Sequence, residues 1–220
     1  MKLVVATRSR DKLREIRAIL APVSGLQVMD LDEAGLPEVP EEEEIEAFET
    51  FEENAGAKAA WFRERTGLPV VADDSGLEVD ALGGAPGVWS KRFAPESVRL
   101  SGADRDQANN RHLLERLEGV PPVERTARYV CVAVLDRGDG SPMAFRGEAE
   151  GVILTEPRGE GGFGYDPLFY DPELGKGFGE IAPETKDARS HRGKAFRALA
   201  RYLVGHGSAG QKPPEGEAGP

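Results

Sequence analysis

This chain of 220 residues has little cysteine and no long apolar run. Its single cysteine, Cys131, cannot form a disulfide within the chain, and its apolar neighbours favour a small core residue. The longest apolar run, residues 129–135, is far shorter than the roughly 20 residues of a membrane-spanning helix. Four apolar residues lead into the first charged stretch, where a secretory signal needs about 7 to 15. We therefore expect a soluble, cytoplasmic protein without a membrane partner.

Basic side chains are absent from residues 18–57, where 12 acidic residues gather. The formal net charge is −11, and leaving out these 12 acids makes it +1. The negative total argues against a nucleic-acid partner, because duplex binding depends on Lys and Arg that neutralise phosphates. The balanced remainder still allows a local basic pocket for a small anion. We expect most of the acidic run to be a solvated loop, with individual members able to bind a metal.

The length fits one large domain, since about 150 residues per domain is typical. Half of residues 205–220 are Gly or Pro, and none of them has a large apolar side chain. Such a segment cannot offset the entropy of ordering, so we predict a disordered tail there and a single domain over residues 1–204.

Hydrophobic spacing and capping residues predict a mixture of strands and helices. Thr50 with Glu53 forms a capping box at the start of a helix that Gly67 ends, and Ser190 caps the last helix. The predicted strands are residues 2–7, 70–72, 127–135, 143–149 and 151–154, and the predicted helices are residues 11–20, 51–66, 103–117 and 191–203. Helices mixed with isolated and consecutive strands indicate an α/β protein with a mixed sheet.

The turn of residues 7–12 lies between the first predicted strand and the first predicted helix. It combines hydroxyl and basic side chains with free backbone N–H groups at a helix N-terminus, where an anion is favoured. Without the Gly-rich pattern of a P-loop, it is either a phosphate site or an ordinary turn with basic surface residues. The residues concerned are Thr7, Arg8, Ser9, Arg10, Asp11 and Lys12.

Lys58 falls on an apolar helical stripe with Phe51 and Phe62. Asn54 lies one turn before it, on an adjoining face. A lysine on this stripe either extends past its neighbours to water or pairs with a carboxylate or a phosphate.

Asp73 and Asp74 follow a short apolar strand and begin the sequence Asp-Asp-Ser-Gly, which we predict to be a turn. Neighbouring side chains in extended backbone point to opposite sides, so one carboxylate can bind Mg²⁺ while the other braces the turn. The alternative is an Asp-rich turn that satisfies its own backbone.

Residues 159–164 match the Gly-x-Gly-x-x-Gly pattern of dinucleotide-binding proteins. That fingerprint needs a strand before it and a helix that begins within it, and Pro157 and Pro167 flank it here, which breaks any helix. Phe163 and Tyr165 beside Asp166 instead indicate a platform that stacks on a flat ring and binds its edge. Core packing of the two aromatic rings is the alternative.

His191 and Arg192 form a cationic pair in the first turn of the last predicted helix, where the helix dipole disfavours positive charge. With Lys186 nearby, they predict an anionic or carbonyl-bearing ligand between this helix and residues 7–12. A solvated helix start is the alternative.

Together these segments resemble the inosine triphosphate pyrophosphatase family, whose members hydrolyse noncanonical purine nucleoside triphosphates such as ITP, dITP and XTP. The resemblance covers nearly all of residues 1–203. It rests on four motifs in order: Thr-Phe-Glu-Glu-Asn-Ala with Lys58, Ala-Asp-Asp-Ser-Gly-Leu followed by Asp-Ala-Leu-Gly-Gly-Ala-Pro-Gly, Gly-Gly-Phe-Gly-Tyr-Asp-Pro-Leu-Phe, and Ser-His-Arg.

The resemblance implies a two-lobed mixed α/β fold, a homodimer and a role for each motif. Residues 7–12 and Lys58 would hold the triphosphate, and Ser75 would contact the substrate. Glu46 and Asp74 would bind Mg²⁺, and Asp74 would also be the base that activates water. The base pocket would consist of Phe163, Gly164, Tyr165, Asp166, Lys186, His191 and Arg192.

Two positions depart from the family pattern. Ser9 stands where Asn is usual, and Ala47-Phe48 stands where a Thr-Gly pair usually follows the metal-binding Glu. The first departure affects one phosphate or sugar contact, and the second affects the backbone that would aim Glu46.

The motifs and the resemblance predict one reaction, in which water attacks the α-phosphorus of the triphosphate and expels pyrophosphate. Mg²⁺ and Lys58 would neutralise charge that grows on the leaving group. A pocket that pairs with a 6-keto group would discriminate against ATP. Two other functions stay open: a pyrophosphatase for modified pyrimidine nucleotides, and a non-catalytic nucleotide-binding or metal-binding module.

Overall fold

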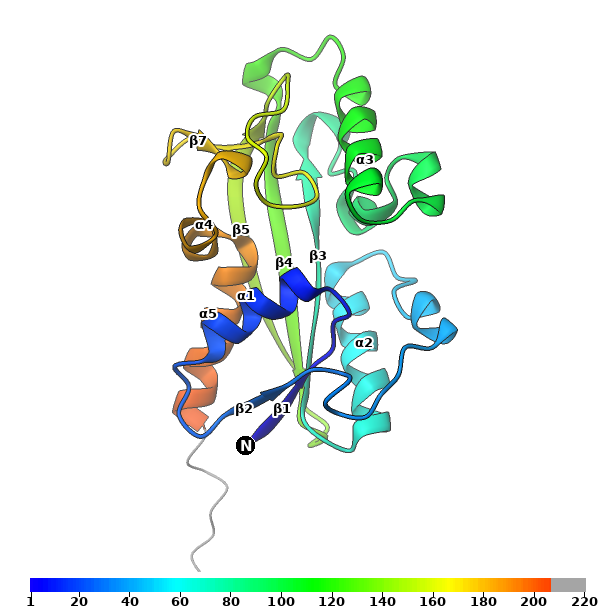
Figure 1. Ribbon diagram of the computed structural model, residues 1–220, viewed down its shortest axis with the longest axis vertical. Coiled ribbons are helices and arrows are strands. Elements are labelled where there is room, and N and C mark those ends of the chain that lie inside the picture. Colours follow the sequence, from blue (N-terminus) through cyan, green and yellow to red (C-terminus); the bar gives the residue numbers. More distant parts are fainter. Residues whose placement is uncertain (207–220) are drawn as a thin grey trace, which may run out of the picture.

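The structure, a computed structural model, describes residues 1–206 and is built around a seven-stranded mixed sheet (Figure 1). The strands lie in the order β2-β1-β3-β4-β5-β6-β7. β1 is parallel to β2 and β3, and the later neighbours are antiparallel, which confirms the predicted mixed sheet. The bounds are β1 Lys2–Val5, β2 Gln27–Met29, β3 Val70–Val79, β4 Thr126–Asp136, β5 Met143–Ile153, β6 Phe169–Asp171 and β7 Lys176–Gly177.

Helices cover both faces of the sheet, with α1 and α5 on one face and α2 on the other (Figure 1). Successive side chains of β4 point to opposite faces of the sheet, and both faces bury apolar residues. Cys131 and Ala133 belong to the core under α1 and α5, and Val130 and Val132 belong to the core under α2. The α-helices are α1 Arg10–Leu20, α2 Phe51–Thr66, α3 Gly102–Arg116, α4 Pro183–Arg189 and α5 His191–His206. Among the residues described, no helix is both long and apolar enough to cross a membrane.

A third core cluster lies at the other end of the long strands. It joins α3 to β3 and β4 through buried side chains that include Leu113, Leu77 and Ala127. The molecule therefore has two lobes, one around each end of the long strands, as Figure 1 shows. The predicted two-lobed α/β fold is confirmed.

β1 is much shorter than β3 and leaves part of one edge of β3 without a neighbouring strand. β1 pairs with β3 only at Val70 and Val71, after which the chain turns into α1. α1 leads to β2 on one side of β1, and α2 leads to β3 on the other side, across the opposite face of the sheet. The carboxyl end of β1 is therefore a topological switch point, the place where open α/β sheets bind ligands.

The helix caps read from the sequence are confirmed at two helices. The Glu53 N–H donates to Thr50 Oγ1 over 3.2 Å at the start of α2, and Gly67 ends α2 in the left-handed region with φ of 66°. At the start of α5, the Gly193 N–H donates to Ser190 Oγ over 2.8 Å.

The predicted turn over residues 73–76 is wrong, because this segment continues β3. Asp73 pairs in register with Ala133 and Gly76 pairs with Val130, so the ladder to β4 runs straight through the segment. Backbone pairing with a long apolar strand outweighs the turn preference of Asp and Gly.

β5 runs unbroken through Gly151, where the sequence predicted two separate strands. A Cβ at Gly151 would collide with the Tyr170 carbonyl oxygen and the Phe169 ring. Glycine therefore allows β6 to pack closely on β5 rather than ending the strand.

The last helix is longer than predicted. α5 continues past Leu203 to His206, whose ring stacks on Tyr202 with centroids 4.2 Å apart. Two residues of the predicted tail are thus helical, and residues 207–220 lie outside the described part of the chain.

Gly76 gives a test of the fold. A methyl group at this position would collide with the Gly87 carbonyl oxygen and with Ser90 Oγ, so we expect Gly76→Ala to lower the free energy of unfolding by about 1–3 kcal/mol. Gly56→Ala is the control, because nothing lies within 4 Å of a Cβ there and alanine favours a helix interior by up to about 1 kcal/mol. Urea unfolding of both variants measures the difference, and equal stability would contradict the close packing at Gly76.

Candidate active site

The turn after β1 contributes one charged side chain to the switch point. Lys12 Nζ donates to Asp73 Oδ2 over 3.0 Å. The hydroxyls of Thr7 and Ser9 stabilise the turn instead: Thr7 Oγ1 accepts the Ser9 N–H over 3.2 Å, and Ser9 Oγ accepts the Lys12 N–H over 3.4 Å. The turn thus places Lys12 at the free edge of β3.

Three other members of the predicted turn lie away from Asp73. Arg10 and Asp11 are exposed. Arg8 points to the acidic segment before α2, where it pairs with Glu42 over 2.7 Å. The structure therefore does not bring these three side chains to the switch point.

Asp73 and Asp74 leave β3 toward opposite faces of the sheet, as the sequence predicted. Asp73 Oδ2 accepts from Lys12 and, over 3.4 Å, from Arg192 Nε on the face of α1 and α5. Asp74 Oδ2 accepts from Asn54 Nδ2 over 3.0 Å on the face of α2. Asp73 and Asp74 thus connect polar side chains on the face of α1 and α5 to polar side chains on the face of α2.

Asp73 is a permanent charge at the centre of this arrangement. It is 1% exposed, and burial alone would raise the pKa of its carboxyl group. The positive charges of Lys12, Arg192 and Lys58 outweigh burial and hold that pKa far below its usual range.

On the face of α2, Lys58 pairs with a carboxylate, which answers the question left open by its position on the apolar stripe. Lys58 Nζ donates to Glu46 Oε1 over 2.6 Å and to the Asp73 carbonyl oxygen over 3.1 Å. Burial opposes the charge on both partners, yet their attraction outweighs it, lowering the pKa of Glu46 and raising that of Lys58.

Asp74 lies beside this ion pair, and the pKa of its carboxyl group is raised where those of Glu46 and Asp73 are lowered. Burial, and after it the negative charge of Glu46, raises the pKa of Asp74 to about 6. The Ser75 N–H donates to Asp74 Oδ1 over 2.9 Å, and Asn54 holds Oδ2. A held carboxylate with this pKa is suited to accept a proton near neutral pH.

Glu46 and Asp74 fit the predicted Mg²⁺ site. In residues 1–206 no group of three or more His, Cys, Asp or Glu side chains is placed to hold a metal. Mg²⁺ needs fewer protein ligands, because it keeps several waters and is bound through one or two carboxylates and substrate phosphates. A cation between Glu46 and Asp74 would relieve the repulsion that raises the pKa of Asp74.

A second cluster centres on Asp166, which is buried. Its Oδ2 accepts from Lys186 Nζ and from the Phe163 N–H, the latter over 2.7 Å, and its Oδ1 accepts from the Tyr129 hydroxyl over 3.3 Å. Lys186 Nζ lies 4.3 Å from the centroid of the Phe163 ring. These contacts fix an aromatic face and an ammonium side by side.

Tyr165 belongs to the core rather than to this platform. It is buried in the third cluster, and its hydroxyl donates to the Ser90 carbonyl oxygen over 2.8 Å. Gly164 beside it donates its N–H to Asp106 Oδ2 over 2.8 Å. The core-packing alternative is therefore correct for Tyr165 and not for Phe163, which is half-buried next to Lys186.

His191 is a buried, neutral ring at the edge of the second cluster. It stacks on Tyr129 with ring centroids 4.7 Å apart. Burial, and then the charges of Arg192 and Lys186, hold its pKa well below the usual range. Within the described residues, His191 Nδ1 is buried and has no hydrogen-bond partner. An unpaired ring nitrogen favours a ligand that supplies the missing hydrogen bond.

Arg192 is neutralised from within the protein, where its position had predicted a ligand. It donates to Glu15 Oε2 over 2.8 Å and to Ser75 Oγ over 3.0 Å, besides Asp73. The negative charge that its position requires is therefore supplied by Asp73 and Glu15, and the alternative of a solvated helix start is wrong for Arg192, which is 2% exposed. Arg192 links the clusters nonetheless, because its guanidinium also lies 5.8 Å from the centroid of the Phe163 ring.

Sequence reasoning missed Glu15, Lys91 and Arg105. Glu15 is buried on α1 next to Ile16, and the signal that could have found it is the need of Arg192 for an acidic partner. Asn109 Nδ2 donates to the Lys91 carbonyl oxygen over 3.3 Å, and Arg105 lies one turn before Asn109 on α3. Burial and the charge of Arg105, followed by the charges of Lys12 and Lys58, lower the pKa of Lys91, so Lys91 shares the electrostatic environment of these cations.

The fold and these clusters define an α/β protein with two joined polar clusters at the carboxyl end of β1. The model of the Ham1 family matches residues 3–202, and the chain belongs to this family.

Similar proteins agree with that membership. A dITP/XTP pyrophosphatase of Thermus thermophilus is 51% identical over 199 residues, 90% of each chain. A protein of the same name from Geobacter sulfurreducens is 50% identical over 202 residues, 92% of this chain and 96% of the relative. Among solved structures, a HAM1 protein from Coxiella burnetii matches with a TM-score of 0.81 and 36% identity, covering 93% of this chain and 99% of the other.

His191 predicts a pH dependence of stability. Because its pKa is depressed in the folded protein, the unfolded chain takes up a proton below about pH 6.5 that the folded chain does not. Relative to His191→Asn, we expect the free energy of unfolding of the wild type to fall by up to about 1.4 kcal/mol per pH unit between about pH 6.5 and 5. Urea unfolding at several pH values measures this difference, and a difference independent of pH would contradict a neutral His191.

Proposed function

We propose that this chain is an enzyme that hydrolyses noncanonical purine nucleoside triphosphates such as dITP and XTP to the monophosphate and pyrophosphate. One observation carries the proposal: residues 73–75 of β3 join a cluster of carboxylates and cations to a cluster with an aromatic face and an unpaired ring nitrogen. The names of the curated relatives support the same assignment.

Asp74 is the residue that we assign to activate water. Its carboxylate is largely ionised at neutral pH and accepts a proton from the water that attacks the α-phosphorus. The bond from the α-phosphorus to the bridging oxygen breaks, and pyrophosphate leaves with the electron pair. Asn54 and the Ser75 N–H keep the carboxylate in place during this step.

Cations around Asp74 stabilise the negative charge that grows on the leaving group. Lys12 and Lys58 are hydrogen-bonded to Asp73, the residue next to Asp74. Lys91 and Arg105 add positive charge from the second lobe. Glu46 and Asp74 would hold Mg²⁺, which supplies further neutralisation of the phosphates when bound.

The second cluster is suited to recognise the base. A purine ring can stack on Phe163, and Lys186 can donate to a 6-keto oxygen. Adenine presents a 6-amino donor at that position and cannot accept the hydrogen bond. A site built to pair with the keto oxygen therefore discriminates against ATP.

We also propose the homodimer that the family resemblance implies. Trp89 and Phe48 are large apolar side chains with exposed fractions of 51% and 45%. Trp89 lines an open hollow of about 530 Å³ between the start of α2 and residues 83–89. This hollow shares no lining residue with the predicted site, so it is a surface separate from the site. The cytoplasmic location stays a prediction from the sequence.

Removing the assigned base tests the reaction. We expect Asp74→Asn to lower kcat for XTP by at least about 100-fold, because an amide accepts no proton from water and carries no charge for Mg²⁺. Asp139→Asn, at an exposed hairpin, is the control and keeps wild-type turnover. Chelation of Mg²⁺ should abolish pyrophosphate release by the wild type, and its return should restore it. Near-normal turnover of Asp74→Asn with saturating Mg²⁺ would overturn the assignment.

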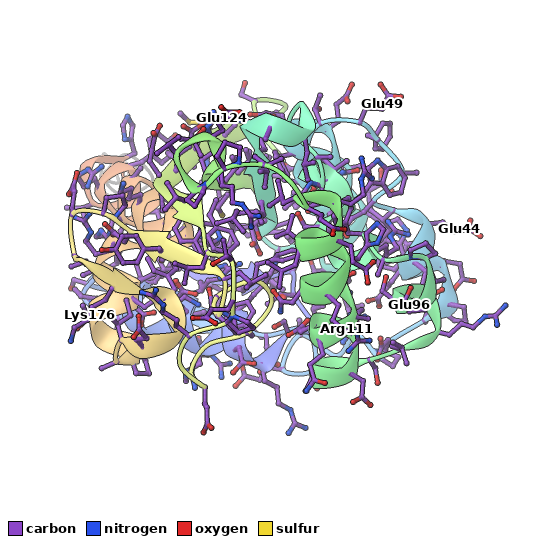
Figure 2. The ribbon with its side chains drawn as sticks, turned by 90° about the horizontal axis from the view of Figure 1, so that it is seen from above. Glu44, Glu49, Glu96, Arg111, Glu124 and Lys176 are labelled. Atoms are coloured by element: carbon purple, nitrogen blue, oxygen red, sulfur yellow. The ribbon has the colours of Figure 1, made fainter. Side chains whose placement is uncertain are left out.

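A nucleotide panel tests the substrate class. We expect kcat/KM for dITP and XTP to exceed that for ATP, and Lys186→Ala to narrow that ratio by about tenfold or more. Lys176→Ala is the matched control and should leave the ratio unchanged, because Lys176 is an exposed residue of β7 at the edge of the molecule (Figure 2). Preference for modified pyrimidine triphosphates, or nucleotide binding without pyrophosphate release, would favour one of the two alternative functions.

A further inference from the structure

The segment that carries Glu46 has little regular structure of its own. Between β2 and α2, residues 30–50 contain one short 3₁₀ helix, η1 (Pro40–Glu44), and no strand. The position of Glu46 relative to Asp74 therefore depends on side-chain contacts that fasten this segment to the sheet.

Arg8 makes the largest of these contacts. Its Nε and Nη2 donate to the two carboxylate oxygens of Glu42 over 3.0 and 2.7 Å. Its Nη1 donates to the Leu36 carbonyl oxygen over 3.0 Å and to Asp32 Oδ1 over 3.2 Å. One guanidinium thus holds three points of the segment.

Two properties separate this contact from an ordinary surface ion pair, which contributes little to stability. The side chains of Arg8 and Glu42 are 24% and 13% exposed, and the pairing is bidentate. Glu42 also accepts the Val39 N–H over 3.3 Å, so the pair fixes the backbone of η1 and not only a flexible side chain. The hydrogen bond to Glu42 also raises the pKa of the Arg8 guanidinium above its ordinary value.

The other end of the short stretch from Glu42 to Glu46 is fastened as well. Lys58 holds the Glu46 carboxylate, and Arg92 Nη2 donates to the Glu46 carbonyl oxygen over 3.3 Å. Arg8 itself lies in the turn that leads to Lys12. Its pairing with Glu42 therefore connects the turn proposed to hold phosphate to the segment that carries Glu46.

We propose that Arg8 is a positioning residue for Glu46: through Glu42 it holds the acidic segment against the turn after β1, and it does not contact the substrate. The proposal rests on the proposed function for its kinetic consequence. Residues that hydrogen-bond a metal ligand directly are typically worth about 10- to 100-fold in metal affinity, and because Arg8 acts on Glu46 through Glu42 and the backbone, we take the lower end of that range. We therefore expect Arg8→Ala to raise the Mg²⁺ concentration for half-maximal turnover by about tenfold or more, with KM for XTP at saturating Mg²⁺ little changed.

Three further variants isolate the contact. Glu42→Gln should act in the same direction as Arg8→Ala. Glu44→Gln is the matched control, because Glu44 lies on the same 3₁₀ helix and projects from the edge of the molecule in Figure 2. The double variant Arg8→Glu with Glu42→Arg reverses the pair and should recover part of the Mg²⁺ response, which a merely structural defect would not.

Amide hydrogen exchange gives a readout that needs neither metal nor nucleotide. We expect residues 38–48 to exchange faster in Arg8→Ala and Glu42→Gln than in the wild type, and α5 to be unaffected. Unchanged exchange in residues 38–48 would overturn the proposal, and so would a raised KM for XTP with an unchanged Mg²⁺ response, which would assign Arg8 to the phosphates. If the wild type released no pyrophosphate, the proposed function would fail while the exchange result still decided the role of Arg8.

Discussion

The early end of β1 is the constraint on which the rest of the site depends. Because β1 stops at Val5 while β3 continues to Val79, the strand that carries Asp73 and Asp74 has a free edge beside the start of α1. The missing strand leaves room for side chains and for a ligand at a position where a complete sheet would have backbone. Both faces of β3 are usable there, since α1 and α5 cover one face and α2 covers the other.

Buried charge holds this place together. Asp73, Arg192 and Glu15 come from a strand and two helices, and each is almost fully removed from solvent. Such a set is stable only when it is complete, because a buried charge left without its partner is destabilising by about 3–5 kcal/mol. The charges therefore fix how α1 and α5 sit on β3, and through Arg192 they hold the Ser75 hydroxyl in place before any ligand binds.

Local signals in the sequence were sufficient for the longer elements, and they missed the short strands β2, β6 and β7 and the short helix α4. The cap at Thr50 and the stop at Gly67 bound α2. The position of Lys58 left water, a carboxylate and a phosphate open as its partner, and the structure gives it the carboxylate of Glu46. Asp73 and Asp74 point to opposite faces of the sheet, as predicted, although their segment is a strand and not a turn. That error came from a non-local cause, since pairing with β4, about 60 residues away, decides the backbone of β3.

The remaining site residues depend on contacts between distant parts of the chain. Glu15 pairs with Arg192, 177 residues later, and Arg8 pairs with Glu42, 34 residues later. Neither Glu15 nor Glu42 is marked by spacing or by a motif. Glu15 looks like an ordinary charged residue on a helix, and Glu42 looks like one member of an acidic run. Only the packing of α5 against α1, and of residues 30–50 against the turn after β1, brings these charges together.

Cys131 gives the sheet an internal chemical reporter. It sits on β4 opposite Ser75, fully buried, with its Sγ 3.9 Å from Asp73 Oδ2, and burial raises the pKa of its thiol. A buried thiol with a raised pKa is inert toward alkylating and disulfide reagents while α1 and α5 cover it. As the single thiol of the chain, it becomes accessible when the core under α1 and α5 opens, so its labelling kinetics measure how often that core opens.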